Sequence, residues 1–301
     1  MKSPKVAIVI TTYNQDFLSE RCICSLREKT NYKNYKVYLV DDSGKGEIGE
    51  KIKKKFSWVD VTINKKNLGF SKSNNIGIKK ALKKYNPDYV LLLNDDTEVV
   101  QKDWLKKMVE VGESDEKIGI LGCKIIYPDG SLQWFFKNSK INFMKKNKFI
   151  KDTKETSTIK EIKDVIGACF MISKKVINKV GLLDEKFSPF YGEDTDFCCR
   201  TSKKGFKLIY VGNTKIIHYG SSSTKTICNE RIWFIKKRNA IRLEWLNFSF
   251  RKIISYSFIH LGSAILNKNP LKKLRLLLKA YLINLNDLKE IKRKRNERNK
   301  Y

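Results

Sequence analysis

Three polar clusters carry side chains that bind ligands or transfer protons, and each follows a short apolar run. They occupy residues 11–14, 41–44 and 94–97. Adjacent carboxylates such as Asp95 and Asp96 repel each other unless a cation or several hydrogen-bond donors lie between them. One interpretation is a divalent cation that bridges a carboxylate to ligand phosphates. The other is a solvated acidic turn before a helix that Asp103 caps.

A second group of candidates lies later in the chain. Asp196 and Arg200 are spaced i,i+4, which predicts an ion pair on a helix. Glu193 and Asp194 stand at the start of that helix, where the macrodipole favours ionised carboxylates. They suit either a helix cap or a general base. His218 follows a predicted strand and is either a packed side chain or a ligand.

The elements that must position these residues alternate between strand and helix. Strands are predicted at 6–10, 37–40, 59–63, 89–93, 118–126, 165–172, 208–211 and 215–219. Several are continuously apolar, as in sheets that are buried on both faces. Helical stripes lie between the early strands, for example Leu18, Cys22 and Leu26. The alternation predicts an α/β fold with a mostly parallel sheet, in which ligand sites gather at the carboxyl ends of the strands.

The charge of the chain is large and unevenly placed. The 301 residues include 62 Lys and Arg against 32 Asp and Glu, a net charge of +30. This excess predicts an acidic partner: nucleic acid, an anionic membrane face or a phosphorylated ligand. Residues 226–301 form a basic helical extension after a body at 1–225. Its stripes predict packing on the body, contact with an anionic leaflet, or both. Residues 137–160 are Lys-rich and predicted to be a mobile surface loop.

The cysteines and the hydropathy profile indicate a cytoplasmic protein. The seven cysteines form no C-x-x-C pair and most lie among apolar neighbours, as reduced core residues do. With only two histidines a zinc cage is not expected. The amino-terminal residues do not resemble a signal peptide, and no apolar stretch is long enough to predict a membrane-spanning helix.

Eight stretches together resemble the family 2 glycosyltransferases of the GT-A fold, especially their rhamnosyltransferase-like branch. In order, these are VAIVITTYN, VYLVDDSGKGE, NKKNLGFSKSNNIGIKKA, YVLLLNDDTEVV, ILGCKIIYPDG, VIGACFMISKK, VGLLDEKFSPFYGEDTDFCCR and HYGSSS. They cover roughly residues 5–223 in the order typical of the family. The resemblance implies a Rossmann-like GT-A catalytic domain followed by the basic helical extension.

The resemblance also assigns roles by position. It implies nucleotide-sugar binding by Thr12, Tyr13, Asn14, Asp41, Asn67, Gly69, Asn74 and Asp95, with Asp41 bonded to the base. Asn94-Asp95-Asp96 stands at the place of the D-x-D motif, with Asn94 in place of the first aspartate. Asp96, assisted by His218, would bind Mg²⁺ or Mn²⁺. Asp194 of the Glu193-Asp194 catalytic pair would be the general base.

The implied activity is sugar transfer with inversion, from a nucleotide-diphosphate donor to a hydroxyl of a lipid-linked glycan or polysaccharide precursor. Inversion needs one carboxylate as base, unlike the two carboxylates of a hydrolase. The implied location is peripheral, at the inner face of the cell membrane. The alternatives are a basic nucleic-acid-binding protein, for which no known motif is present, and an inactive nucleotide-sugar-binding module.

Overall fold

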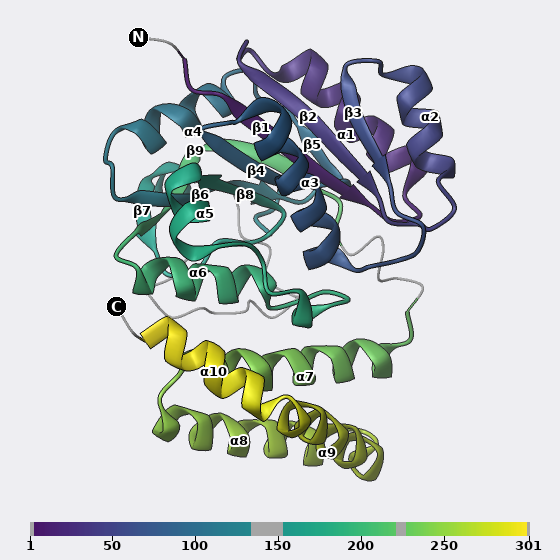
Figure 1. Cartoon of the computed structure of the whole chain (residues 1–301), viewed down its shortest axis with the longest axis vertical. Helices are drawn as coiled ribbons and strands as arrows, with labels where there is room; N and C mark the ends of the chain where they lie inside the picture. Colours follow the sequence, from purple (N-terminus) through teal and green to yellow (C-terminus); the bar gives the residue numbers. More distant parts are fainter. Residues whose placement is uncertain (1–2, 134–152, 221–226, 300–301) are drawn as a thin grey trace.

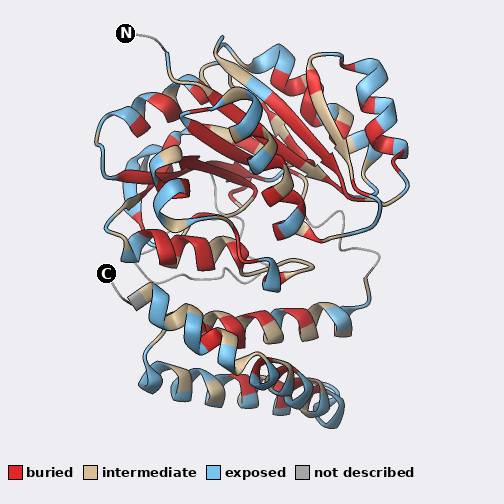
Figure 2. Cartoon of the chain, in the orientation of Figure 1, coloured by how far each residue is buried: buried red, intermediate tan, exposed pale blue. Residues whose placement is uncertain are grey.

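Runs of Val, Ile and Leu form the strands of one mixed sheet in this computed structural model, which describes residues 3–133, 153–220 and 227–299. The central strands are buried on both faces, because helices cover each side of the sheet (Figures 1 and 2). The strands are β1 (Val6–Thr12), β2 (Tyr35–Asp41), β3 (Val59–Ile63), β4 (Tyr89–Asn94), β5 (Thr97–Val99), β6 (Ile118–Ile126), β7 (Ile159–Ile162), β8 (Cys169–Ser173) and β9 (Lys207–His218).

The strand order confirms the predicted α/β fold with a mostly parallel sheet. The order is β3-β2-β1-β4-β8-β6-β9-β5, with β7 paired to β9. Strands β3, β2, β1 and β4 are parallel, as are β6 and β9. Strand β8 runs antiparallel between β4 and β6. The carboxyl ends of β1, β2 and β4, which carry the three polar clusters, therefore lie at one edge.

Helices cover both faces of the sheet and continue beyond it at the carboxyl end (Figure 1). The helices are α1 (Asp16–Lys29), α2 (Glu47–Lys55), α3 (Phe70–Tyr85), α4 (Trp104–Glu113), α5 (Lys174–Val180), α6 (Glu193–Lys203), α7 (Asn229–Asn247), α8 (Phe250–Ile265), α9 (Pro270–Asn286) and α10 (Leu288–Asn299), with 3-10 turns η1 (Lys154–Ser157) and η2 (Glu185–Phe187). Apolar residues of α1, α2 and α4 pack on one face. Those of α3, α5 and α6 pack on the other.

Several local predictions differ from the structure. The two strands predicted at 208–211 and 215–219 are one strand, β9, because its backbone pairs almost continuously with β6. The short strands β5 and β7 were not predicted, since both form only by pairing with β9. β7 overlaps the end of the predicted mobile loop, so that prediction was wrong for residues 159–160; residues 137–152 of the loop lie outside the described residues. Asp103 stands at the N-cap of α4 as predicted, but its side chain makes no capping hydrogen bond and pairs with Lys107 at 2.7 Å.

The carboxyl-terminal helices are attached to the body through α7. The amide of Asn239 donates to the backbone carbonyls of Phe187, Phe190 and Tyr191. Arg242 is almost fully buried and pairs with Asp184 at 3.1 Å. The predicted boundary at residue 225 falls within 221–226, outside the described residues. None of the described helices is both long and apolar enough to cross a membrane.

Asp184 ties the extension to the body, so we expect a pH-dependent stability. Burial raises the pKa of this carboxyl, but Arg242 and Lys294 outweigh burial and lower the pKa to about 2. A lowered native pKa adds stability above the unfolded value near 3.8 that is lost as pH falls toward 2. The difference corresponds to about 2 kcal/mol in the free energy of unfolding. Urea unfolding of wild type and Asp184→Asn at pH 7 and pH 3 measures this contribution: the difference in unfolding free energy between the two proteins should be smaller at pH 3 than at pH 7.

Candidate active site

The ends of β1 and β4 form a buried polar cluster. Thr12 is fully buried, and its hydroxyl lies 2.7 Å from that of Ser19 on α1. The Ser19 hydroxyl donates to Asp95 at 3.3 Å, and the backbone amide of Tyr13 also bonds this carboxylate. Burial, with the neighbouring charge of Asp96, raises the pKa of Asp95 to about 7. Asp95 therefore points into the protein and fixes the loop that carries Thr12 and Tyr13.

Asp96 and His218 meet at the same edge. The turn after β4 is closed by the Thr97 hydroxyl, which donates to the carbonyl of Asn94 at 2.7 Å. Thr97 then pairs with His218 in the β5–β9 ladder. This pairing places Nε2 of His218 3.0 Å from Oδ1 of Asp96. The structure thus brings together the two residues that sequence reasoning assigned to a metal.

The chemistry of these groups fits a divalent cation. Nδ1 of His218 lies 2.5 Å from the side-chain amide oxygen of Gln133, which favours the proton on Nδ1 and leaves a lone pair on Nε2. The side-chain amide nitrogen of Asn94 lies 3.3 Å from Nε2 and can donate to that lone pair. The lone pair and the Asp96 carboxylate oxygen attract each other only through a proton or a cation between them. Asn94 adds a buried Oδ1 with no partner among the described residues. The carboxylate and amide oxygens suit Mn²⁺ or Mg²⁺, and a neutral imidazole is a common metal ligand. Among the described residues, no group of three or more His, Cys, Asp or Glu side chains is placed to hold a metal ion.

Asp41 ends β2, Asp42 follows it, and both carboxylates accept hydrogen bonds from backbone amides. Asp41 is fully buried, and its two oxygens accept from the amides of Ser43 and Gly49 at 2.9 and 2.7 Å. Asp42 accepts from the side chain of Asn64 and from the amides of Leu68 and Gly69. Asp41 therefore shapes the turn into α2, and its bond to a base stays a prediction. Asp42 anchors the segment 64–69, a role that the sequence analysis did not predict.

The predicted nucleotide-sugar segment lies on this anchored loop. Gly69 has a φ of +84°, and a side chain there would meet Ser188 Oγ at 2.8 Å and the Pro189 backbone at 3.0 Å. Asn67 is exposed on the loop, as Tyr13 and Asn14 are after β1. Asn74 is buried and donates to the carbonyl of Phe70 within its own helix. The structure thus places Asn67, Tyr13 and Asn14 where a ligand can reach them, whereas Asn74 is bonded within α3.

Glu193 and Asp194 begin α6 next to the loop before β8. Asp194 accepts from the backbone amides of Gly167 at 3.0 Å and Thr195 at 2.8 Å. Burial raises the pKa of Asp194, while these amides oppose the rise. Glu193 is buried, its pKa is raised well above the usual range by burial and by Asp194, and its Oε2 has no partner among the described residues. Asp194 is therefore the oriented carboxylate of the pair.

The loop at 167–168 joins this pair to the cluster at β4. The amide of Gly167 binds Asp194, and the carbonyl of the next residue, Ala168, accepts from the amide of Asn94 at 3.1 Å. The carboxylate of α6 and the Asn94–Asp96 turn are thus adjacent across one stretch of backbone. Asp164, on the same loop, accepts a hydrogen bond from the Thr195 hydroxyl at 3.1 Å. Burial and the charge of Asp194 raise the pKa of Asp164 to about 7.

The supporting residues Ser19, Asp42, Gln133 and Asp164 escaped sequence reasoning. Asp42 had a signal, since it lies in a polar cluster that follows a strand. Ser19 and Gln133 had none, because their contacts join positions that are 76 and 85 residues apart in the chain.

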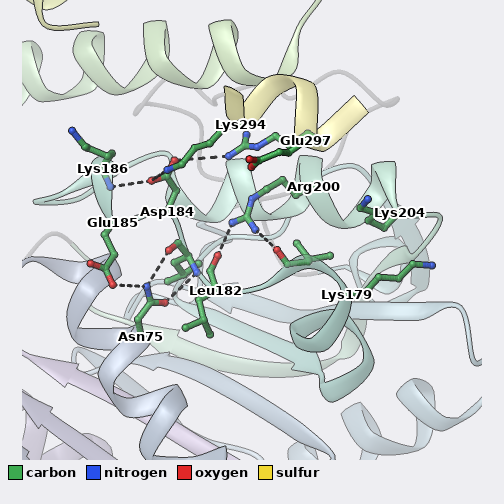
Figure 3. Close-up of a pocket in the computed structure, with 13 residues that line it drawn as sticks. Asn75, Lys179, Leu182, Asp184, Glu185, Lys186, Arg200, Lys204, Lys294 and Glu297 are labelled. Carbon is green, nitrogen blue, oxygen red and sulfur yellow. Dashed lines mark hydrogen bonds and ion pairs between the residues drawn. The ribbon is translucent and has the colours of Figure 1, made fainter. Parts of the chain in front are cut away.

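The position of α6 is set by the carboxyl-terminal helices. Asp196 is fully buried and pairs with Arg200 at 2.9 Å and with Arg298 of α10 at 2.6 Å. The Asp196–Arg200 pair confirms the predicted i,i+4 contact. Beside it lies a cavity of about 640 Å³ (Figure 3). Several charged groups that line it are already bonded within the protein. Arg200 donates to the carbonyls of Val180 and Leu182, and Lys294 pairs with Asp184. This cavity is part of the interface between the body and the carboxyl-terminal helices.

Known proteins share parts of this sequence and this fold. The family described as "Glycosyl transferase family 2" matches residues 7–181. An O-antigen biosynthesis protein, RfbC, of Myxococcus xanthus is 25% identical over 236 residues, 74% of this chain and 18% of that protein. The low-salt glycan biosynthesis hexosyltransferase Agl10 of Haloferax volcanii is 26% identical over 153 residues, 47% of this chain and 46% of that protein. The chain thus spans less than half the length of either relative.

Two solved structures share the fold. GalNAc-T7 with UDP, GalNAc and Mn²⁺ has a TM-score of 0.63 at 18% identity, over 90% of this chain and 54% of that one. The mannosyltransferase PcManGT of Pyrobaculum calidifontis, with GDP-Man and Mn²⁺, has a TM-score of 0.58 at 12% identity, over 93% and 76%. The sheet with its flanking helices is therefore the GT-A fold, and the chain belongs to the family 2 glycosyltransferases.

Proposed function

We propose that this protein is an inverting glycosyltransferase that uses a nucleotide-diphosphate sugar as donor. One observation carries the proposal: the loop at 167–168 holds Asp194 on one side and the Asn94–Asp96 turn on the other. A base and a diphosphate site must flank the anomeric carbon for a single in-line displacement. The donors bound to the two structural neighbours, and the glycan pathways in the names of the relatives, support the same conclusion.

The chain's own residues have distinct parts in this reaction. Asp194 removes the proton of the acceptor hydroxyl as that oxygen attacks the anomeric carbon from the side opposite the diphosphate. The amides of Gly167 and Thr195 keep this carboxylate oriented. Asp96, His218 and Asn94 would hold Mg²⁺ or Mn²⁺. When bound, such a cation supplies positive charge beside the departing diphosphate.

The donor and acceptor are part of the same proposal. The segment 64–69, with Tyr13 and Asn14, would contact the nucleotide sugar, and rhamnose is the sugar that the sequence resemblance favours. A lipid-linked glycan or polysaccharide precursor would be the acceptor, which the names of the relatives support. The enzyme would work at the cytoplasmic face of the cell membrane, bound peripherally.

Thermal shift with a panel of nucleotide sugars, with and without Mn²⁺, tests the proposal. We expect one donor to raise the unfolding midpoint by mass action, and more so with the metal. Turnover of that donor with a glycan acceptor should follow, with inverted product by NMR. No shift with any donor would contradict the proposal. Donor binding without turnover would favour the inactive binding module.

Asp42→Ala should weaken donor binding through the loop. The change removes the acceptor of the Leu68 and Gly69 amides and one of the two acceptors of the Asn64 side-chain amide, which also donates to Ser73. Each unsatisfied buried donor costs about 1–3 kcal/mol. We expect the KM for the donor to rise by about 10- to 100-fold, because a loss of 1.4 kcal/mol in binding free energy weakens binding about tenfold. The matched control is Asp129→Ala, in an exposed turn. An unchanged KM would show that segment 64–69 does not contact the donor.

A further inference from the structure

Helices α8 and α9 expose large apolar side chains. The residues that are at least 43% exposed are Phe250, Ile254, Phe258, Ile259, Leu261, Ile265, Leu271, Leu278, Leu282 and Leu285, with Leu266 at 88% just after α8. Single exposed apolar residues are common on protein surfaces, whereas a contiguous set indicates an interaction site. We call this set the α8–α9 face.

The face is arranged as stripes that turn away from the body. On α8, positions 250, 254, 258, 261 and 265 repeat with helical spacing and share one side. Other residues of the two helices contact α7. Nε2 of His260 on α8 lies 2.9 Å from Glu244, and the side-chain amide of Asn284 on α9 donates to the carbonyl of Arg238. Ile241, Ala264 and Leu277 form the core between the three helices. Since α7 packs on the body, α8 and α9 form the outermost layer (Figures 1 and 2).

The charge around the face has one sign. Residues 245–286 contain no Asp or Glu and seven Lys or Arg. Six of these cations are exposed: Arg251, Lys252, Lys268, Lys272, Arg275 and Lys279. Lys272 also pairs with Glu230 of α7. Elsewhere Lys and Arg alternate with acids, as in the pairs that Lys51 and Lys55 make with Glu20. Within residues 245–286, every charged side chain beside the apolar stripes is thus a cation.

We propose that the α8–α9 face docks on an anionic lipid bilayer. Apolar side chains enter the boundary between headgroups and acyl chains, while Lys and Arg extend to the lipid phosphates. Two copies of this face would bring their cations together, so charge opposes a symmetric dimer through it. Nucleic acid would pair with the cations but leave the apolar side chains in water. If the proposed function holds, docking brings the site to acceptors carried by the same membrane.

Co-sedimentation of the whole protein with vesicles tests the docking without turnover. The probes are phosphatidylcholine vesicles and vesicles in which about one third of the lipid is phosphatidylglycerol. We expect binding to the anionic vesicles that weakens with salt, because counterions screen the attraction. Binding to neither vesicle would overturn the proposal.

Two sets of variants locate the contact. Neutralising Lys252, Lys268 and Arg275 together to Gln should lower the vesicle partition coefficient on the order of 100-fold, and the control changes Lys33, Lys53 and Lys54 to Gln. Phe258→Ser with Leu278→Ser should also weaken binding strongly, whereas Ile159→Ser on β7, where the side chain is 50% exposed, should not. Circular dichroism checks that each variant is folded.

Three outcomes would overturn the assignment. These are binding that the α8–α9 variants leave unchanged, an equal loss in the controls, and a dimer in sedimentation velocity that Phe258→Ser with Leu278→Ser dissociates. The last would make a second copy the occupant of the face. Transfer to a water-soluble acceptor is measured in parallel. Wild-type protein that transfers sugar but does not bind anionic vesicles would refute the docking face alone, and wild-type protein that binds the vesicles without transferring sugar would refute the proposed function alone.

Discussion

Asp194→Asn is expected to lower kcat by about 10³-fold while donor binding stays close to that of the wild type. The amide has nearly the shape of the carboxylate but cannot accept the proton of the acceptor hydroxyl. Its carbonyl oxygen can still accept one of the two backbone amides, from Gly167 or Thr195, so α6 should stay in place. Initial rates at saturating donor, with donor affinity from calorimetry, separate the two effects.

Glu193→Gln is the matched control for this prediction. Glu193 is adjacent and buried, and burial together with the charge of Asp194 raises its pKa well above the usual range, which disfavours the ionised form that a base needs. Its amide should therefore retain most of the activity. A large loss in Glu193→Gln with an active Asp194→Asn would reverse the assignment of the two residues.

The pH profile gives a second test of the same base. Burial raises the pKa of Asp194, and the base works only when it is ionised. The rate should therefore fall as the pH drops through a value above the ordinary pKa of aspartate, near 3.9. Asp194→Asn should lose this acidic limb. A limb that survives in the variant would belong to another group.

Asp96→Asn is the second substitution with a large expected effect, about 10²- to 10³-fold in kcat. It removes the carboxylate that faces His218 at 3.0 Å, and with it the charge that would attract a divalent cation. Chelation of metal from the wild type should cause a loss of similar size, and added Mn²⁺ should restore the wild type but not the variant.

A readout without turnover accompanies this prediction. Mn²⁺ should raise the unfolding midpoint of the wild type and leave that of Asp96→Asn unchanged. Without metal, the variant should be at least as stable as the wild type, because two adjacent buried carboxylates repel each other. An equal shift by Mn²⁺ in both proteins would place the cation elsewhere.

The α/β fold and the main strands were predictable because local rules decide them. Continuous apolar runs such as β1 and β4 are stable only when both faces of the sheet are covered. The polar clusters at their ends followed from the same reasoning, since the carboxyl ends of parallel strands meet at one edge. The Asp196–Arg200 pair was predictable because helical spacing alone brings the two side chains together.

Contacts between distant segments decided the rest. His218 reaches Asp96 because β5 pairs with β9, and β5 has only three residues, too few to give a periodic pattern. Asp42 anchors segment 64–69 because the loop after β3 lies against the end of β2, a contact that the sequence pattern does not show.

The amino-acid sequence by itself determined the family resemblance, the chemical types at the strand ends and the basic character of the extension. The tertiary structure decided which of two adjacent carboxylates is oriented by backbone amides, and which apolar stripes of the extension are covered. Phe234 and Trp245 of α7 pack in the helical core, whereas Phe258 and Leu278 remain exposed. The physical reason is that periodicity shows that a side of a helix is apolar, but burial depends on what packs against it.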